Sequence, residues 1–269
     1  MDANEILIEP SELAAAMAAG ALLIDARKAG DFRTGHIPGA MPFSTYDSFV
    51  ADSSSDGMRA FAKAIAFRFM GIGVRLDRSI VVYDEDTGMR AAREAWLLEF
   101  LGHRRTRILH GGLKGWIAAG GPVLDNDDVI TAQRGHLEVP AVFGRDVAAD
   151  EVAYRAGSDN FVVIDVRDDL EWAGKDDTPC CARRGHIPHA VHIEWTNFLE
   201  NGRFKSAAAI NALLAGHGVN PHKEIAVYCH RGARSANAYY ALKYAGVPYV
   251  RNFIGSWHEW SARTEFPVA

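Results

Sequence analysis

The sequence repeats itself. Five segments of its first half recur in its second half, in the same order. The pairs are residues 22–32 and 162–172, 35–40 and 185–190, 80–84 and 225–229, 95–103 and 238–247, and 110–116 and 253–260. Chance matches seldom keep one order over five pairs, so we predict a duplicated chain. Its 269 residues are enough for two domains that each bury a core.

The boundaries of the repeat predict the domain organisation. Residues 125–144 match nothing in the other half, are polar, and are punctuated by Gly and Pro. We therefore expect a first domain over 1–124, a linker over 125–145 and a second domain over 146–269. The second copy also carries an insertion at 173–182, which contains two adjacent cysteines.

Within each copy, two periodicities alternate. Short apolar, β-branched runs at 21–24, 80–83, 162–166 and 225–228 predict buried strands. Residues 238–245 keep helical spacing of apolar side chains, and Gly246 follows as a helix-ending glycine. Strands that alternate with helices predict an α/β fold, with a central parallel sheet flanked by helices in each domain. Ligands of such folds bind beyond the carboxyl ends of the strands.

One loop has the composition of a reactive site. The segment CHRGARS, residues 229–235, joins a predicted strand to a predicted helix. A loop at a helix N-terminus directs backbone N–H groups and the positive end of the helix dipole at one point. A cysteine there has a lowered pKa, helped by Arg231 and Arg234. Gly232 lets the loop close, and Ser235 can donate its hydroxyl or cap the helix. We therefore predict that Cys229 is a nucleophile in a nest of N–H donors.

Four features together resemble the rhodanese family: residues 32–40, an Asp-x-Arg after a strand, the cysteine loop, and GSWHEW at 255–260. With the duplication, the chain resembles the family's tandem-domain thiosulfate and mercaptopyruvate sulfurtransferases over essentially its whole length. The resemblance implies two rhodanese-type domains and a ping-pong reaction in which Cys229 carries sulfur as a persulfide. It also implies a substrate-binding set formed by His230, Arg231, Gly232, Ala233, Arg234, Ser235 and Arg184.

The first copy departs from this pattern at the reactive position. Asp84 stands where the second copy has Cys229. A carboxylate cannot form a persulfide, so we expect the first domain to be catalytically silent. The alternative is a metal site built from Asp84, Glu85 and Asp86. Adjacent acidic residues in a loop are more often solvated, so we predict no metal and no cofactor.

The inserted cysteines, Cys180 and Cys181, are predicted to lie in a plain loop. Adjacent cysteines seldom form a disulfide. Neither C-x-x-C spacing nor a nearby histidine pair supports zinc. The alternative is a role in resolving a persulfide or an oxidised Cys229.

Other residues that recur in both copies are predicted to be structural. Asp25 with Arg27, and Asp165 with Arg167, are interpreted as ion pairs, and His36 and His186 as parts of a turn. We expect Trp116, Trp257 and Trp260 to pack against the domain edges, and Trp195 to line the pocket.

The cysteine loop also bears on the reaction class. Four residues separate Cys229 from Arg234, whereas the phosphatases that resemble this fold use the wider C-x5-R loop. Mercaptopyruvate-type loops are small and nearly neutral. The present loop, with His230, Arg231 and Arg234, is expected to be strongly cationic and so to suit the thiosulfate dianion by charge-assisted hydrogen bonding. We therefore predict sulfur transfer from thiosulfate to cyanide or a thiol, with a redox protein as a further candidate acceptor. A 3-mercaptopyruvate sulfurtransferase and a protein-fed persulfide relay remain the alternatives.

Charge and hydropathy set the expected surroundings. The net charge of -5 and the pI near 6.1 give no reason to expect a nucleic-acid partner. No apolar run reaches the roughly 20 residues that span a bilayer, so no membrane partner is expected. The first residues do not form an export signal, and three cysteines do not form a disulfide framework. We therefore expect a cytoplasmic protein.

Overall fold

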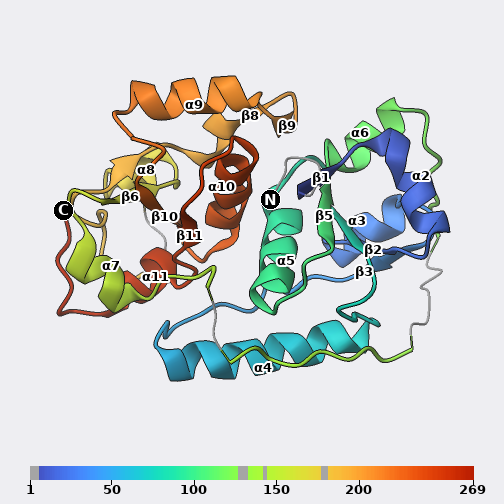
Figure 1. Cartoon of the computed structure of the whole chain (residues 1–269), viewed down its shortest axis with the longest axis horizontal. Helices are drawn as coiled ribbons and strands as arrows, with labels where there is room; N and C mark the ends of the chain where they lie inside the picture. Colours follow the sequence, from blue (N-terminus) through green and yellow to red (C-terminus); the bar gives the residue numbers. More distant parts are fainter. Residues whose placement is uncertain (1–5, 127–132, 142–143, 177–180) are drawn as a thin grey trace. The chain divides into compact units, whose positions relative to one another are not determined.

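The computed structural model describes residues 6–126, 133–141, 144–176 and 181–269. The chain forms two compact units (Figure 1). The first comprises Met1–Asp47, Phe61–Phe143 and Asn201–Phe204; the second comprises Ser48–Ala60, Gly144–Glu200 and Lys205–Ala269. Segments 48–60 and 201–204 thus belong to a different unit from most of their chain neighbours, which the expected boundaries at 124 and 146 do not anticipate. No described helix is both long and apolar enough to cross a membrane.

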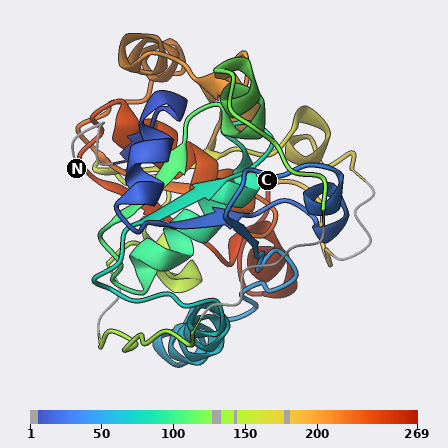
Figure 2. The ribbon, with the colours of Figure 1, turned by 90° about the vertical axis from the view of Figure 1, so that its right-hand side faces the viewer.

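The first unit is built on a parallel sheet with the strand order β1-β5-β4-β2-β3 over its described residues. Its elements are β1 (Leu7–Ile8), α2 (Pro10–Ala18), β2 (Leu22–Asp25), α3 (Ala29–Thr34), β3 (Ala40–Pro42), α4 (Ser55–Gly71, which begins in the second unit), β4 (Ile80–Tyr83), α5 (Met89–Phe100), β5 (Thr106–Leu109), α6 (Gly112–Ala118) and β9 (Arg203–Phe204). Figure 2 turns the ribbon by 90° and shows α4 nearly end-on.

Alternation along the strands of the first unit places a core on each face of its sheet. Leu23 and Val81 point to one face, where they pack against Leu13 of α2, Phe32 of α3 and Trp116 of α6. Helix α5 packs against β4 and β5 and is buried along nearly its whole length. The sheet is therefore covered on both faces, as the runs of apolar residues predict.

The second unit repeats this plan with the strand order β11-β10-β6-β7, again parallel over its described residues. Its elements are α7 (Ala149–Arg155), β6 (Phe161–Asp165), α8 (Asp169–Trp172), β7 (Val191–His192), the 3-10 helix η1 (Trp195–Phe198), β8 (Leu199–Glu200), α9 (Ala207–Gly216), β10 (Glu224–Tyr228), α10 (Ala233–Tyr244), β11 (Val250–Asn252) and α11 (Ser256–Ala262).

The core of the second unit positions the cysteine loop. Val163 and Ala226 pack with Val152 of α7 and with Trp257 and Trp260 of α11. Helix α10 packs against β10 and β11. The loop between β10 and α10 therefore lies at the carboxyl edge of the sheet. The predicted fold class, two α/β domains with parallel sheets flanked by helices, is confirmed.

Candidate functional site

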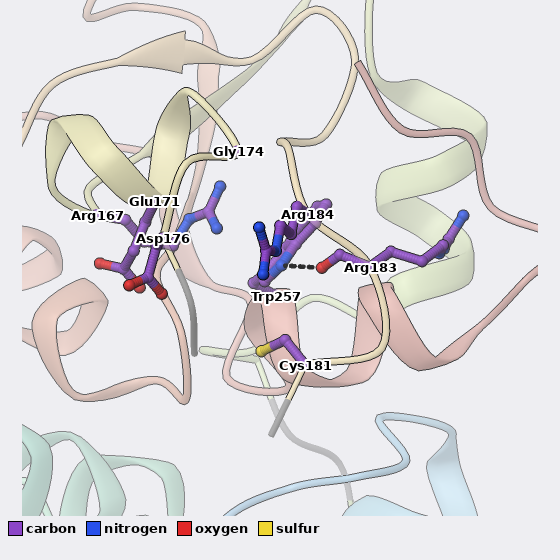
Figure 3. A pocket seen from close by; sticks show the side chains of 8 residues that line it. All are labelled: Arg167, Glu171, Gly174, Asp176, Cys181, Arg183, Arg184 and Trp257. Carbon is purple, nitrogen blue, oxygen red and sulfur yellow. Dashed lines mark hydrogen bonds between the residues drawn. The ribbon is translucent and has the colours of Figure 1, made fainter. Parts of the chain in front are cut away.

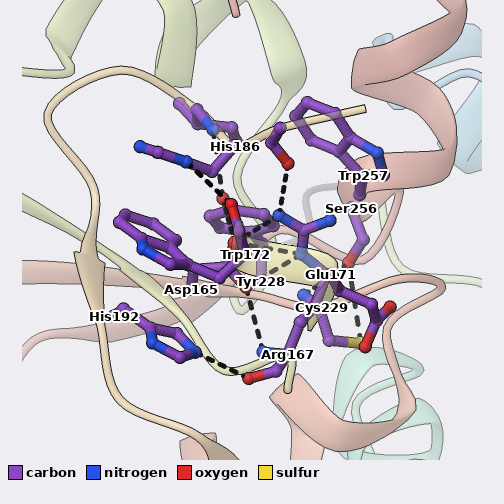
Figure 4. Close-up of polar contacts among 12 residues, drawn as sticks. Asp165, Arg167, Glu171, Trp172, His186, His192, Tyr228, Cys229, Ser256 and Trp257 are labelled. Carbon is purple, nitrogen blue, oxygen red and sulfur yellow. Dashed lines mark hydrogen bonds and ion pairs between the residues drawn. The ribbon is translucent and has the colours of Figure 1, made fainter. Parts of the chain in front are cut away.

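Asp165, Arg167 and Tyr228 form a buried hydrogen-bond network at the carboxyl end of the second sheet (Figure 4). We call this network the lock. Asp165 ends β6 and accepts hydrogen bonds from the backbone N–H of Arg167 at 2.9 Å and from its Nε at 3.0 Å. The Tyr228 hydroxyl donates a hydrogen bond to the carboxylate of Asp165, and the same hydroxyl oxygen accepts a hydrogen bond from the N–H of Ile187 at 3.1 Å. Arg167 donates further to the carbonyl of Gly185 at 2.8 Å. Burial, the strongest influence, raises the pKa of Tyr228 well above its usual value, so its hydroxyl stays a donor.

The first unit contains the same lock. Asp25 accepts from the backbone N–H and Nε of Arg27, both at 3.0 Å, and from the hydroxyl of Tyr83 at 2.6 Å. The Tyr83 hydroxyl accepts the N–H of Ile37 at 3.2 Å. Both arginine–aspartate ion pairs are buried, which confirms that they are structural.

The two repeated histidines contact the helices that precede them. His36 Nδ1 lies 3.0 Å from the carbonyl of Phe32, and His186 Nδ1 lies 3.0 Å from that of Trp172. Each imidazole also stacks on the ring of the residue whose carbonyl it contacts. The ring centroids are 3.8 Å apart for Phe32 and His36 and 3.5 Å apart for Trp172 and His186. Both histidines therefore make the same structural contact with the preceding helix in the two copies.

Cys229 follows β10 directly, and only 1% of it is exposed. Its Sγ accepts the N–H of Gly232 at 3.1 Å and faces the hydroxyls of Ser235 at 3.5 Å and Ser256 at 4.0 Å. Gly232 has φ of +84°, and a Cβ there would lie 2.6 Å from Ile254 Cγ1. Only glycine therefore fits where the loop turns into α10, which begins at the buried Ala233.

The surroundings of Cys229 lower the pKa of its thiol. Burial, the largest influence, raises it, but the Arg234 charge, hydrogen bonds from the hydroxyl and N–H of Ser235, and the N–H of Arg231 outweigh burial. The positive end of the α10 dipole acts in the same direction. The predicted lowering of this pKa is confirmed, and it favours the nucleophilic thiolate.

Arg234 is held by an acidic partner that the sequence analysis did not identify. Its guanidinium bonds both carboxylate oxygens of Glu171 in α8, with 2.8 Å between Nη2 and Oε1. A capping box fixes Glu171, since its carboxylate accepts the N–H of Asp168 at 3.3 Å while Asp168 accepts the N–H of Glu171 at 3.0 Å. Arg234 is therefore oriented by an ion pair, and part of its charge is compensated.

Two side chains of the cysteine loop, those of Arg231 and His230, have surroundings that the sequence does not reveal. The guanidinium of Arg231 stacks over the ring of Phe49, with 4.4 Å from Cζ to the ring centroid. Burial, followed by the charges of Arg231 and Arg234, lowers the pKa of His230 to about 4. His230 is therefore neutral at pH 7, and its expected contribution of positive charge to the loop is wrong.

The two arginines before the second GHIP turn have different environments. Arg183 is an anchor that donates to the backbone carbonyls of Trp260, Ser261, Arg263 and Phe266. Arg184 lines a small cavity of about 20 Å³, which is room for roughly one water molecule. Of the described residues, eight line this cavity (Figure 3), and they include Glu171 and Trp257 but not Cys229. Arg184 thus lies beside the partner of Arg234 rather than at the thiol.

The start of α11 contacts the cysteine loop. Residues 255–260 carry part of the family resemblance, but these contacts were not predicted from the sequence. Trp257 N–H donates to the carbonyl of Cys229 at 2.9 Å, and His258 N–H donates to that of His230 at 3.0 Å. Ser256 Oγ accepts the N–H of Cys229 at 3.2 Å. Ser256 has φ of +56°, a left-handed conformation that disfavours side chains. The equivalent residue in the first copy is Gly112, with φ of +57°. The replacement of this glycine by serine in the second copy is the signal in the sequence that points to Ser256.

In the first copy, a carboxylate occupies the corresponding loop. Asp84 accepts the N–H of Glu85 at 2.9 Å and of Arg90 at 3.0 Å. Burial raises its pKa despite these hydrogen bonds. The neighbouring acids form ion pairs, Glu85 with Arg27 at 3.2 Å and Asp86 with a lysine of α6 at 2.9 Å. The three acids are therefore not simply solvated, in contrast to the expectation from the sequence, because Asp84 is buried and its two neighbours form ion pairs.

The remaining predicted residues lie partly outside this loop. Trp116, Trp257 and Trp260 are buried in the two cores, whereas they were expected at the domain edges. Trp195 begins η1 and is not among the described residues around the cavity of Figure 3. Cys180 lies outside the described residues.

Cys181 is described, and it differs from expectation. Its Sγ lies within 4.8 Å of ring nitrogens of His230 and His258. The expectation that no histidine pair lies near it is therefore wrong, because the fold brings two histidines from distant positions.

Comparisons with known proteins agree with this architecture. The Rhodanese-like domain family matches residues 9–119 and 148–263. Thiosulfate sulfurtransferase of Pseudomonas aeruginosa is 32% identical over 275 residues, which cover 98% of this chain and 96% of the relative. The 3-mercaptopyruvate sulfurtransferase of Escherichia coli is 31% identical over 252 residues, which cover 91% of this chain and 86% of the relative.

A solved structure supports the same assignment. The crystal structure of SseA from Escherichia coli, described with the rhodanese fold and the mechanism of 3-mercaptopyruvate sulfotransferases, is 27% identical with a TM-score of 0.78. The match covers 94% of this chain and 99% of that chain. On the fold, the duplicated lock and these matches, the chain belongs to the rhodanese family and contains that family's domain twice.

Proposed function

We propose that this protein is a thiosulfate sulfurtransferase that carries the sulfane sulfur as a persulfide on Cys229. The observation that carries this proposal is the buried Cys229 thiol, with a lowered pKa and the Gly232 N–H 3.1 Å from its sulfur. Relatives named thiosulfate sulfurtransferase that match nearly the whole chain support it.

The proposed first half-reaction is a sulfur transfer to the enzyme. The Cys229 thiolate attacks the outer sulfur of thiosulfate, an S–S bond forms, the S–S bond of thiosulfate breaks, and sulfite leaves with the electron pair. The terminal sulfur of the persulfide then carries the negative charge. The N–H groups of residues 230–234, with the Ser235 hydroxyl, are proposed to stabilise that charge.

The second half-reaction restores the thiolate. Cyanide or a thiolate attacks the terminal sulfur, the persulfide S–S bond breaks, and its electron pair returns to Cys229. With cyanide the product is thiocyanate, and with a thiolate it is a new persulfide. A redox protein with an exposed thiol is a candidate acceptor of the same chemistry.

Arg234 is proposed to attract the donor dianion, with Arg231 and Arg184 as further candidates. Its ion pair with Glu171 fixes the guanidinium, so little conformational freedom is lost when an anion binds. Because His230 is neutral, this charge comes from the arginines rather than from the imidazole.

Asp84 is proposed to leave the first domain, over residues 1–124, without sulfur chemistry. Its carboxylate already accepts the N–H of Glu85 in the loop and the N–H of Arg90 in the first turn of α5. We place the activity in the cytoplasm, where a reducing environment keeps a thiol such as Cys229 reduced.

Steady-state kinetics with both donors test the proposal. We expect the kcat/KM for thiosulfate, with cyanide as acceptor, to exceed that for 3-mercaptopyruvate, and Cys229→Ser to abolish both activities. A preference for 3-mercaptopyruvate would assign the donor differently. Failure with both donors, together with loading by a protein desulfurase, would favour a persulfide relay.

A further inference from the structure

Three side chains that can bind a metal ion lie close together, separate from the N–H groups that surround the Cys229 sulfur. Cys181 comes from the insertion of the second copy, His230 from the cysteine loop and His258 from α11. One ligand atom from each, a sulfur and two ring nitrogens, lies within 4.8 Å of the others. All three residues belong to the second unit and are partly buried.

The backbone holds the two histidines together. His258 N–H donates to the carbonyl of His230 at 3.0 Å, and the preceding Trp257 N–H donates to that of Cys229 at 2.9 Å. The first copy keeps the same backbone pairing between Lys114 and Glu85 at 3.0 Å. The backbone pairing is therefore a property of the fold in both copies. The side chains differ, because the paired positions carry Glu85 and Lys114 in the first copy and His230 and His258 in the second.

His258 provides an independent sign of a missing partner. Its Nδ1 is buried, and no hydrogen-bond partner for it exists among the described residues. On another side the ring meets Phe49 edge-on, with centroids 4.7 Å apart. A buried ring nitrogen without a partner is costly, and a metal ion is one way to satisfy it.

We propose that Cys181, His230 and His258 bind a zinc ion. A thiolate and two imidazoles are ligands that zinc prefers, and three protein ligands leave a fourth position for water. Ligand atoms on one tetrahedral zinc lie roughly 3.5 Å apart, so side-chain movements of about 1 Å close the present arrangement.

Zinc at this site would inhibit sulfur transfer. His230 directly follows Cys229, so an ion on its imidazole restrains the loop whose N–H groups surround the thiol. The metal site stands without the proposed function, whereas the inhibition rests on it.

Cobalt titration of the reduced full chain tests the site. Co²⁺ bound to a thiolate gives a ligand-to-metal charge-transfer band in the near ultraviolet, and zinc displaces it. We expect this band at one equivalent, its loss in Cys181→Ser and its weakening in His258→Asn. Cys180→Ser and Cys229→Ser are matched controls that should keep the band.

Several outcomes would overturn the site. These are no band in the wild type, an undiminished band in Cys181→Ser, or loss of the band only in Cys229→Ser. Folding is checked by thermal unfolding with and without zinc. Zinc should raise the melting temperature of the wild type and of Cys229→Ser, but not of Cys181→Ser.

Turnover measures the inhibition separately. We expect saturating zinc to lower the thiosulfate turnover of the wild type about tenfold and to leave that of Cys181→Ser near its own zinc-free value. Equal inhibition of both would contradict regulation through this site. Because Cys229→Ser has no turnover but should still bind cobalt, failure of the metal site and failure of the proposed function are distinguishable.

Discussion

The guanidinium of Arg234 and the carboxylate of Glu171 form a two-pronged ion pair between α10 and α8. The charge of Arg234 also lowers the pKa of the Cys229 thiol. Burial, the largest influence on Arg234 itself, lowers the pKa of its guanidinium, but the Glu171 hydrogen bond and nearby negative charges outweigh burial and raise that pKa on balance. One side chain thus links the capped helix α8 to the reactivity of the thiol.

Replacing Arg234 separates charge from geometry. We expect Arg234→Ala to lower kcat/KM for thiosulfate by roughly 10- to 100-fold, the loss of a charge-assisted hydrogen bond. Arg234→Lys keeps the charge but not the two-pronged contact, so it should lie between alanine and wild type. Kinetics of the three proteins check this order, and unchanged thiosulfate turnover in Arg234→Ala would remove Arg234 from the donor site.

The pH dependence of thiol alkylation reports the state of Cys229. The thiolate is the reactive form, so the alkylation rate rises as pH increases through the thiol pKa. Because that pKa is lowered, the midpoint should lie below that of an ordinary, unperturbed cysteine thiol. In Arg234→Ala the midpoint should move to higher pH, because a positive charge is lost. Stopped-flow alkylation of both proteins measures this, and identical midpoints would contradict the role of Arg234.

Ser256 predicts an unusual order of stabilities. Ser256→Ala leaves the buried Cys229 N–H without its acceptor, at a cost of about 1–3 kcal/mol, and keeps the left-handed backbone. Ser256→Gly loses the same hydroxyl but relieves about 1 kcal/mol of backbone strain. Glycine should therefore be the more stable of the two variants in urea unfolding. An alanine variant as stable as the glycine variant would contradict the strain.

The duplicated lock provides a matched pair of variants. Tyr228→Phe and Tyr83→Phe each remove the hydroxyl that joins an aspartate to a backbone N–H, so each should destabilise the protein by about 1–3 kcal/mol. Only Tyr228 directly precedes Cys229, so only Tyr228→Phe should also change turnover. Parallel unfolding and kinetic measurements test this, and equal turnover losses would show that the two copies are not functionally distinct.

Local patterns were enough to predict the sheets. The run at 80–83 is β4, and the runs near 22, 162 and 225 are β2, β6 and β10 within one residue at each end. These strands are buried on both faces, so apolar β-branched residues mark them continuously. The cysteine loop was equally predictable, because a strand, a glycine at positive φ and a helix follow one another directly in the chain.

Contacts between distant residues were not predictable in this way. Glu171 lies 63 residues before Arg234, and no local pattern pairs them. Likewise, nothing in the sequence assigns Phe49 to the second unit, where it contacts Arg231. The charge of His230 was misjudged for a related reason: the residue type is visible in the sequence, whereas the burial that lowers its pKa depends on the fold.

The intact mass of the protein after incubation with thiosulfate tests the central claim most directly. Wild type and Cys229→Ser are treated in parallel, desalted and measured under non-reducing conditions. The persulfide mechanism predicts a gain of one sulfur atom in the wild type and none in Cys229→Ser. No gain in the wild type, or an equal gain in both proteins, would contradict a persulfide on Cys229.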